Sequence, residues 1–276
     1  MTVPLRGANT LLTGAAGGLG QYIARALAAQ GANLALSDLD EERLAPLVEE
    51  LRGSGVRAET VPADLMDSDG RGRLISDAEE AIGPLDVLVN NAGIEHAGSF
   101  TSNTREEIET IVTVNLMAAM DLSWLVVPGM LERGRGHVVN LASMAGKLPA
   151  LYLATYAATK HGVVGFTHAL RAEYVDEPVS FSAICPIFIS RVGMYGRHEH
   201  KHGEPPPGLR AAPPETVGEA VIEAIREDRA EVIINRGPIR PLIALYAVAP
   251  RTAIRLMNRP QTRRFAEDYA RARGRL

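Results

Sequence analysis

NTLLTGAAGGLG (residues 9–20) places a short apolar run directly before a cluster of glycines, and a helical pattern that ends at Gly31 follows at once. A strand, a glycine turn and the first turn of a helix together form a cradle for a phosphate group. Glycines let the backbone approach the phosphate, and the free amides of the helix face its negative charge. The stretch therefore predicts a nucleotide-binding site within an α/β fold.

Strand-like and helical patterns alternate along the chain after this stretch. We expect further strands at about residues 33–38, 57–61, 86–90, 137–141, 179–184 and 231–234. Between them we expect helices at about residues 41–51, 67–82, 104–132, 154–176 and 214–228. This alternation predicts a Rossmann-type, doubly wound parallel sheet of about seven strands. We expect residues 1–236 to form a single NAD-binding catalytic domain and residues 237–276 to form a C-terminal helical extension.

The composition is that of an ordinary globular protein, with 46% apolar and 22% charged residues. A net charge of -4 gives no case for nucleic acid as a partner. The one cysteine, Cys185, excludes an internal disulfide and fits a reducing compartment. The start of the chain has no signal-sequence pattern, and the longest uncharged apolar stretch, residues 241–250, is too short to span a bilayer. We therefore expect a cytoplasmic protein.

The pair Tyr156 and Lys160 is a second signal, because residues four apart share one face of a helix. A lysine charge about 5 Å from the phenol, at an effective dielectric of about 20, would lower the tyrosine pKa by about two units. The phenol would then be within reach of proton transfer at neutral pH. Ser143 follows the apolar run 138–142, as expected at the carboxyl end of a buried strand, where ligands bind in open α/β sheets.

Asp38 ends the second expected strand. A carboxylate there can accept hydrogen bonds from both ribose hydroxyls of an adenosine and would repel a 2′-phosphate. Its alternative role is to cap the helix that begins at Glu41, a role that Asp40 could equally fill. No Arg or Lys lies within the glycine loop or directly after Asp38, and this favours NAD over NADP.

The motifs that follow one another along the chain together resemble the short-chain dehydrogenase/reductase family in its single-domain branch, over about residues 8 to 235. The family motif T-G-x-x-x-G-x-G is matched by residues 13–20, and N-N-A-G by residues 90–93. The aspartate on the adenine side is matched by Asp64. The active-site tetrad is matched by Asn115, Ser143, Tyr156 and Lys160.

The resemblance implies an NAD-dependent oxidoreductase acting on CH-OH groups. The cofactor-binding residues that it implies are Gly14, Gly18, Leu19, Gly20, Asp38, Asp64, Leu65, Asn91, Ala92, Gly93, Tyr156, Lys160, Pro186 and Ile189. Tyr156 would exchange a proton with the substrate oxygen, and Ser143 would orient that oxygen. Lys160 would lower the Tyr156 pKa and bind the nicotinamide ribose, and Asn115 would hold a water that links Lys160 to solvent. The cofactor would carry the hydride, and the protein would position and tune it.

One stretch departs from the family pattern. The family usually has P-G-x-V-x-T after its sixth strand, whereas residues 186–191 here read Pro-Ile-Phe-Ile-Ser-Arg. Ile187 replaces the glycine and Arg191 the threonine, with Ser190 as a candidate substitute one position earlier. The contacts to the nicotinamide amide are therefore expected to differ locally.

The resemblance implies that residues 190–214 form a substrate-side loop, and such loops are often mobile lids. Candidate substrate contacts are Ser143, Leu148, Tyr152, Met194 and Tyr195, and with the apolar tail they favour a hydrophobic substrate. The alternating residues His198, His200 and His202 would lie on one side of an extended chain. They have no suitably placed Cys or acidic partner, so we expect a solvated loop and no metal ligand.

Residues 237–276 combine an apolar first half with nine Arg against Glu267 and Asp268, a charge of 9 − 2 = +7. This pattern suits a helix that covers the substrate cleft or a neighbouring subunit, or alternatively an interfacial helix that makes peripheral contact with anionic lipid. Nucleic acid is not expected, because the segment has few interleaved aromatic residues. The resemblance also implies a homo-dimer or homo-tetramer formed through the two long helices at about residues 104–132 and 154–176.

The leading hypothesis is an NAD-dependent dehydrogenase that interconverts a hydrophobic secondary alcohol and its ketone. The alternative is an NADPH-dependent carbonyl or 3-oxoacyl-type reductase, against which Asp38 argues. A third reading is a catalytically silent nucleotide-sensing protein. Such proteins usually lose the Tyr/Lys pair, whereas all four tetrad positions are present here.

Overall fold

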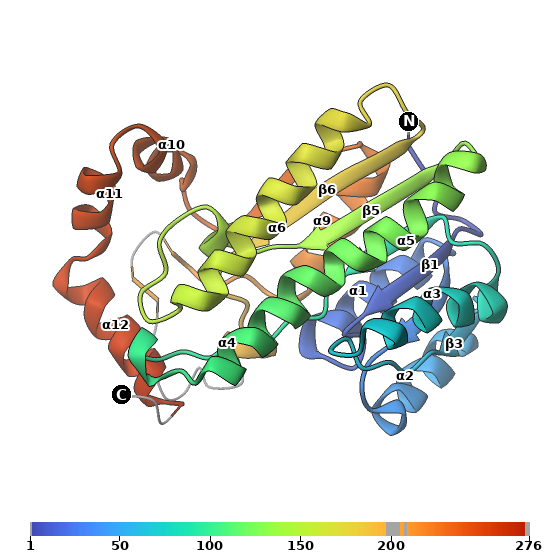
Figure 1. Cartoon of the computed structure of the whole chain (residues 1–276), viewed down its shortest axis with the longest axis horizontal. Coiled ribbons are helices and arrows are strands. Elements are labelled where there is room, and N and C mark those ends of the chain that lie inside the picture. Colours follow the sequence, from blue (N-terminus) through green and yellow to red (C-terminus); the bar gives the residue numbers. More distant parts are fainter. Residues whose placement is uncertain (1, 197–204, 207–208, 274–276) are drawn as a thin grey trace.

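The computed structural model of the chain describes residues 2–196, 205–206 and 209–273. A parallel sheet in the order β3-β2-β1-β4-β5-β6-β7 forms its centre (Figure 1), which confirms the doubly wound architecture. The strands are β1 (Asn9–Thr13), β2 (Asn33–Ser37), β3 (Ala58–Thr60), β4 (Val87–Asn90), β5 (Gly136–Leu141), β6 (Val179–Pro186) and β7 (Glu231–Ile234). The strand order reverses between β1 and β4, and in open α/β sheets ligands bind beside that point, at the carboxyl ends of the strands.

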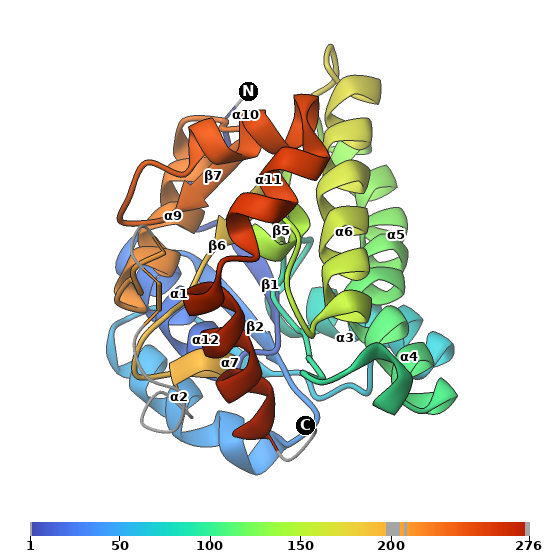
Figure 2. The ribbon, with the colours of Figure 1, turned by 90° about the vertical axis from the view of Figure 1, so that its left-hand side faces the viewer.

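Helices cover both faces of the sheet. One face carries α1 (Gly18–Ala29), α2 (Glu41–Gly53) and α9 (Glu215–Arg226), whose buried side chains share one apolar cluster. The other face carries α3 (Ser68–Ile82), α5 (Ala118–Glu132) and α6 (Ala154–Glu173). Both Figure 1 and Figure 2 show α5 and α6 side by side.

The alternation of side chains along β1 explains why both faces are covered. Leu11 and Leu12 are both fully buried, but Leu11 packs with the cluster of α3 and α5 and Leu12 with that of α1 and α9. Successive side chains of a strand point to opposite faces, so an uninterrupted apolar run needs helices on both sides. The glycine loop therefore emerges from the middle of the core.

The expected single helix over residues 104–132 is wrong in one respect. The run consists of α4 (Arg105–Val112), a π-helical turn (Thr113–Met117) and α5. Single π turns inside α-helices often occur at functional sites, and this one contains Asn115. By length and composition alone, Arg105–Glu132 would suffice to cross a membrane. Side chains such as Leu122 and Val126 are buried against the sheet, as in the core helix of a globular domain.

The C-terminal extension forms three helices, α10 (Arg240–Val248), α11 (Pro250–Met257) and α12 (Pro260–Arg271). Figure 1 shows them at one end of the sheet, and Figure 2, which views the molecule from that end, shows α11 and α12 in front of the strands. Ile239 and Tyr269 are buried within apolar clusters that include residues of the domain, and Ala253 is fully buried. The extension is therefore packed onto the domain. It lies at the carboxyl ends of the strands β5 and β6.

Candidate active site

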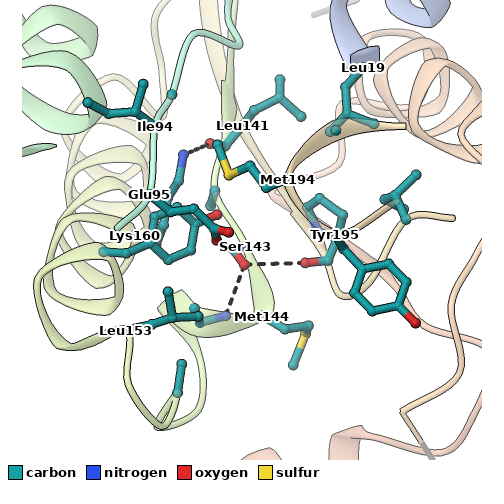
Figure 3. Close-up of a pocket in the computed structure, with 18 of the residues that line it drawn as sticks. Leu19, Ile94, Glu95, Leu141, Ser143, Met144, Leu153, Lys160, Met194 and Tyr195 are labelled. Atoms are coloured by element: carbon teal, nitrogen blue, oxygen red, sulfur yellow. Dashed lines mark hydrogen bonds between the residues drawn. The ribbon is translucent and has the colours of Figure 1, made fainter. Parts of the chain in front are cut away.

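A cavity of about 590 Å³ opens at the carboxyl ends of the strands. Its walls come from the glycine loop, the segments that follow β2, β4, β5 and β6, the helix α6 and the C-terminal helices α11 and α12. Figure 3 shows Ser143, Glu95, Lys160 and Met194 gathered around it. Segments from the whole length of the chain thus meet at one site.

The glycine loop forms the cradle expected from the sequence. Gly14 has a φ of 64°, and a Cβ there would lie 2.8 Å from the Ala92 Cα. A Cβ on Gly18 would lie 2.6 Å from the Gly193 nitrogen, and one on Gly20 would overlap the carbonyl oxygen of Gly14. The helix α1 begins at Gly18 without a side-chain cap, so its first amides are left for an anion. Together with Leu19 these residues fit the pyrophosphate of a nicotinamide dinucleotide.

Asp38 lines the cavity, and the alternative role as a helix cap is wrong. Its Oδ2 accepts a hydrogen bond from the Ala16 amide at 3.0 Å. The cap of α2 is Asp40, whose carboxylate accepts from the Arg43 amide. The sequence reasoning missed Arg43 itself, which lines the cavity and donates to the Ala16 carbonyl at 3.3 Å. Its place in the first turn of the helix after Asp38 was the signal that could have revealed it.

The segments after β3 and β4 complete the wall for the adenosine half of a cofactor. Asp64 and Leu65 line the cavity, and Asp64 accepts a hydrogen bond from the Met66 amide at 2.8 Å. The Asn91 side chain donates to the carbonyls of Thr13 at 2.9 Å and Gly14 at 3.0 Å. The Asn91-Ala92-Gly93 segment therefore braces the glycine loop as well as lining the cavity.

Asn115 is 2% exposed and does not line the cavity. Its amide donates to the Ile94 carbonyl at 2.8 Å, and its Oδ1 accepts from the Ile94 amide at 2.8 Å. It also donates to Thr159 Oγ1 at 3.2 Å. The side chain thus fixes the backbone next to the cavity, and its role in holding a water stays a prediction.

Ser143, Tyr156 and Lys160 all line the cavity. Ser143 Oγ accepts from the Ala145 amide at 3.1 Å and donates to the Pro186 carbonyl at 3.4 Å (Figure 3). It also lies within hydrogen-bonding reach of the Tyr156 phenol. The Lys160 ammonium donates to the Leu141 carbonyl at 2.7 Å and lies 5.7 Å from the centre of the Tyr156 ring. The three side chains can therefore act on one substrate oxygen.

The expected net lowering of the Tyr156 pKa is wrong. Burial raises the pKa of the Tyr156 phenol well above 10, and the Glu95 carboxylate raises it further. Burial also lowers the pKa of Lys160 to about 8. Both shifts arise because a buried site disfavours the charged form of each group, an effect that residue spacing does not reveal.

On the substrate side, Met194, Tyr195 and Leu148 line the cavity as expected, but Tyr152 does not. The Tyr152 hydroxyl instead donates to Glu267 Oε1 at 3.3 Å. The cavity-lining residues that the sequence reasoning did not name as site residues include Glu95, Leu153, Phe188, Leu209, Ile254, Met257, Thr262, Phe265, Ala266 and Tyr269. The spacing of residues 262, 265, 266 and 269 on one helix face was the available signal for those on α12.

The segment after β6 keeps part of the family geometry. Pro186, Ile187 and Ile189 line the cavity. Ser190 does not line it, and its Oγ donates to the Ala212 carbonyl at 3.3 Å, so it does not substitute for the missing threonine there. Arg191 forms an ion pair with Glu215 at 2.6 Å.

No group of three or more potential metal ligands occurs among residues 2–196, 205–206 and 209–273. His198, His200 and His202 lie outside the described residues.

Comparison with known proteins shows what this chain is similar to. A family model described as short chain dehydrogenase matches residues 8–202. The chain is 37% identical over 257 residues to the ketoacyl reductase HetN of Nostoc sp., across 91% of this chain and 88% of the relative. It is 35% identical over 182 residues to D-beta-hydroxybutyrate dehydrogenase of Cupriavidus necator, across 66% of this chain and 70% of the relative.

Two solved structures are similar over most of the fold. A variant of actinorhodin polyketide ketoreductase with NADPH has a TM-score of 0.75 and 31% identity, and the match covers 85% of this chain and 97% of that one. A short chain dehydrogenase/reductase from Burkholderia phymatum in complex with NAD has a TM-score of 0.79 and 26% identity, covering 94% of this chain and 98% of that one. The relatives thus bind nicotinamide cofactors of both kinds.

Proposed function

This chain belongs to the short-chain dehydrogenase family and is an oxidoreductase acting on carbonyl or hydroxyl groups, and we propose that it is NAD-linked and interconverts a hydrophobic secondary alcohol and its ketone. The observation that carries the proposal is one cavity lined by Ser143, Tyr156, Lys160 and the glycine cradle. Bound in that cradle, a nicotinamide cofactor supplies or accepts the hydride.

The side chains then divide the remaining work. Ser143 hydrogen-bonds the substrate oxygen and orients it. The Tyr156 phenol gives that oxygen a proton during reduction and takes it back during oxidation. The raised pKa of Tyr156 keeps the phenol protonated at neutral pH, which suits it to act as the acid in ketone reduction. Lys160, when charged, favours the ionised phenol and so supports the reverse direction.

The walls beyond Ser143 support a hydrophobic substrate. They include Leu148, Leu153, Phe188, Leu209 and Met257. An apolar pocket with few polar groups binds a substrate through its apolar body and uses those groups to fix its orientation. The chemistry of the lining therefore favours a bulky, uncharged ketone or alcohol.

Asp38 supports NAD over NADP, because a carboxylate at this place repels a 2′-phosphate. An NADPH-dependent carbonyl or 3-oxoacyl-type reductase remains the second candidate for two reasons. Arg43 lines the cavity close to Asp38, and relatives include a ketoacyl reductase and a polyketide ketoreductase with NADPH. A catalytically silent protein is the weakest candidate, because the Tyr156 and Lys160 side chains reach the cavity.

The test is a screen that follows oxidation of NADH and NADPH with ketones of graded size. We expect turnover with NADH that improves as the apolar body of the ketone grows. Turnover only with NADPH would overturn the NAD assignment. No turnover with either cofactor, in either direction and with any ketone or alcohol, would overturn the proposed substrate class.

We also propose a cytoplasmic homo-dimer or homo-tetramer, assembled through the outer faces of α5 and α6. Trp124 on α5 is 76% exposed, and Met117, the last residue of the π-helical turn that precedes α5, is 41% exposed. Large exposed apolar side chains of this kind favour burial against a second subunit. Light scattering should give a multiple of the subunit mass that falls in Trp124→Glu.

The outer face of α10 and α11 supports peripheral contact with an anionic lipid surface. Val248 is 83% exposed, and Arg251 and Arg255 are exposed beside it. Apolar side chains bordered by arginines suit the boundary of an anionic bilayer. The protein should sediment with anionic vesicles at low salt, and Arg251→Gln with Arg255→Gln should weaken this. Removal of Arg6 and Arg57, which precede β1 and β3 at the other end of the sheet, should not.

A further inference from the structure

Glu95 is a carboxylate in the active-site cavity to which the proposed chemistry assigns no role. It follows the Asn91-Ala92-Gly93 segment, lines the cavity, and its side chain is 7% exposed. Figure 3 shows Glu95 beside Ser143 and Lys160, pointing into the cavity. A buried charge of this kind is stable only when hydrogen bonds and an opposite charge compensate it.

The partners that compensate Glu95 come from the C-terminal end of the chain. The Tyr269 hydroxyl donates to Glu95 Oε1 at 2.5 Å. The Arg273 Nη2 lies 2.6 Å from the same oxygen, and the Arg273 side chain is only 13% exposed. These contacts, here called the tail closure, join the loop after β4 to α12 and the residues directly after it.

Arg273 extends the tail closure to the substrate-side loop. Its guanidinium lies 3.9 Å from the centre of the Tyr269 ring, and its Nη2 also donates to the Met194 carbonyl at 2.5 Å. Met194 belongs to α7 (Gly193–Gly196), beside the glycine cradle. One guanidinium thus ties together three segments that border the cavity.

The tail closure holds a wall of the substrate site. Thr262, Phe265, Ala266 and Tyr269 line the cavity, and their spacing puts them on one face of α12. Phe265 and Tyr269 pack against Tyr195. The centre of the Tyr195 ring lies 6.4 Å from that of Phe265 and 6.5 Å from that of Tyr269. The Glu95 carboxylate and the Arg273 guanidinium pair with each other. The wall that they hold therefore presents aromatic rings and small side chains to a bound substrate.

We propose that Glu95 is a positioning residue that docks α12 over the catalytic Tyr156 by pairing with Arg273 and Tyr269, and so shapes the site for an uncharged substrate. The inference rests on the proposed function, because Tyr156 and Ser143 define where the substrate reacts. Substrate affinity then depends on the tail closure. The glycine loop of the cofactor cradle is braced instead by the Asn91 side chain, which donates to the Thr13 and Gly14 carbonyls, so NADH binding does not depend on the closure in the same way.

The test uses the full-length protein and the variants Arg273→Gln, Glu95→Gln and the double variant. The matched control is Arg271→Gln, because Arg271 is on the same helix but pairs with Asp268 on the exposed side, at 3.2 Å. For each protein we would measure kcat and KM for a hydrophobic ketone, the Kd of NADH, and hydrogen exchange of the α12 amides.

Arg273→Gln should raise KM about tenfold, leave the Kd of NADH within about twofold of wild type and accelerate exchange in α12. The double variant should be closer to wild type than Arg273→Gln, because it no longer leaves the Glu95 charge buried without an opposite charge. Arg271→Gln should leave KM and exchange unchanged.

The proposal is overturned if Arg273→Gln leaves either KM or α12 exchange unchanged, if KM and the Kd of NADH rise together, or if the effects of the two substitutions simply add. Hydrogen exchange needs no substrate. If the wild-type protein reduced no ketone, the proposed function would fail, and exchange would still decide whether Glu95 and Arg273 hold α12.

Discussion

Replacing Asp38 by Asn tests the cofactor assignment most directly. The substitution removes the charge but keeps an oxygen that can accept from the Ala16 amide, so the glycine loop should keep its shape. The expected result is a change in the preference between NADH and NADPH, with little change in stability.

The size of the effect follows from the charges near Asp38. A phosphate on the ribose 2′ oxygen carries about two negative charges and would lie about 5 Å from the carboxylate. Each pair of unit charges at that distance and a dielectric of about 20 costs about 3 kcal/mol, so the repulsion is about 6 kcal/mol. Arg43, which donates to the Ala16 carbonyl nearby, offsets part of this repulsion. A net preference of about 3 kcal/mol corresponds to roughly a 100-fold ratio of kcat/KM in favour of NADH.

The assay compares kcat/KM for NADH and NADPH in the wild type, Asp38→Asn and Asp40→Asn. Asp40 is the matched control, because it caps α2 through the Arg43 amide and does not line the cavity. Asp38→Asn should reduce the preference at least about tenfold, and Asp40→Asn should leave it unchanged. A wild-type preference for NADPH, or an equal shift in both variants, would refute the reasoning.

Three further predictions concern catalysis, acid stability and the glycine loop. Tyr156→Phe should lower kcat about 100-fold or more while the Kd of NADH stays within a few-fold; residual activity above about a tenth would remove Tyr156 as the general acid. Burial lowers the pKa of His137 to about 4, so the unfolded chain, with a His pKa of about 6.5, binds this proton first as the pH falls. Stability should therefore drop by about 3 kcal/mol between pH 6.5 and 4, and urea unfolding of His137→Gln should lack that part of the drop. Gly20→Ala should weaken NADH binding and lower Tm, because its Cβ would overlap the Gly14 carbonyl oxygen. The free energy of unfolding should fall by about 1–3 kcal/mol. Gly53→Ala, whose Cβ would meet nothing within 4 Å, should change neither NADH binding nor stability.

The neutral state of His137 has a clear structural cause. Ser182 Oγ donates to the Arg229 carbonyl, so it is left to accept from His137 Nε2, at 2.8 Å. The imidazole therefore carries its proton on Nε2. A second proton would have to enter at the buried Nδ1, which has no hydrogen-bond partner among the described residues.

Local signals in the sequence were sufficient for the parallel sheet and for most of the cofactor cradle. The glycines within residues 14–20 adopt a backbone conformation, or lie so close to neighbouring backbone atoms, that a residue with a Cβ would be strained there. The apolar strands that they follow must be buried on both faces, which leaves few possible architectures. The four-residue spacing of Tyr156 and Lys160 likewise fixes their common direction on α6 without any knowledge of the rest of the fold.

Long-range packing decided what these local signals could not. Glu95 meets Tyr269 and Arg273 from the far end of the chain, and the Tyr152 hydroxyl pairs with Glu267 on α12 and does not line the cavity. No periodicity in the sequence encodes such pairings.

The protonation of the site also depends on the tertiary structure. From spacing alone, Lys160 should lower the pKa of Tyr156; in the folded chain, burial and Glu95 raise it. The sequence determined which chemical groups point toward the cavity, because local geometry sets their direction. Only the tertiary structure decided how strongly each group is desolvated and which charges face it, because burial and contact depend on every segment that packs around the site.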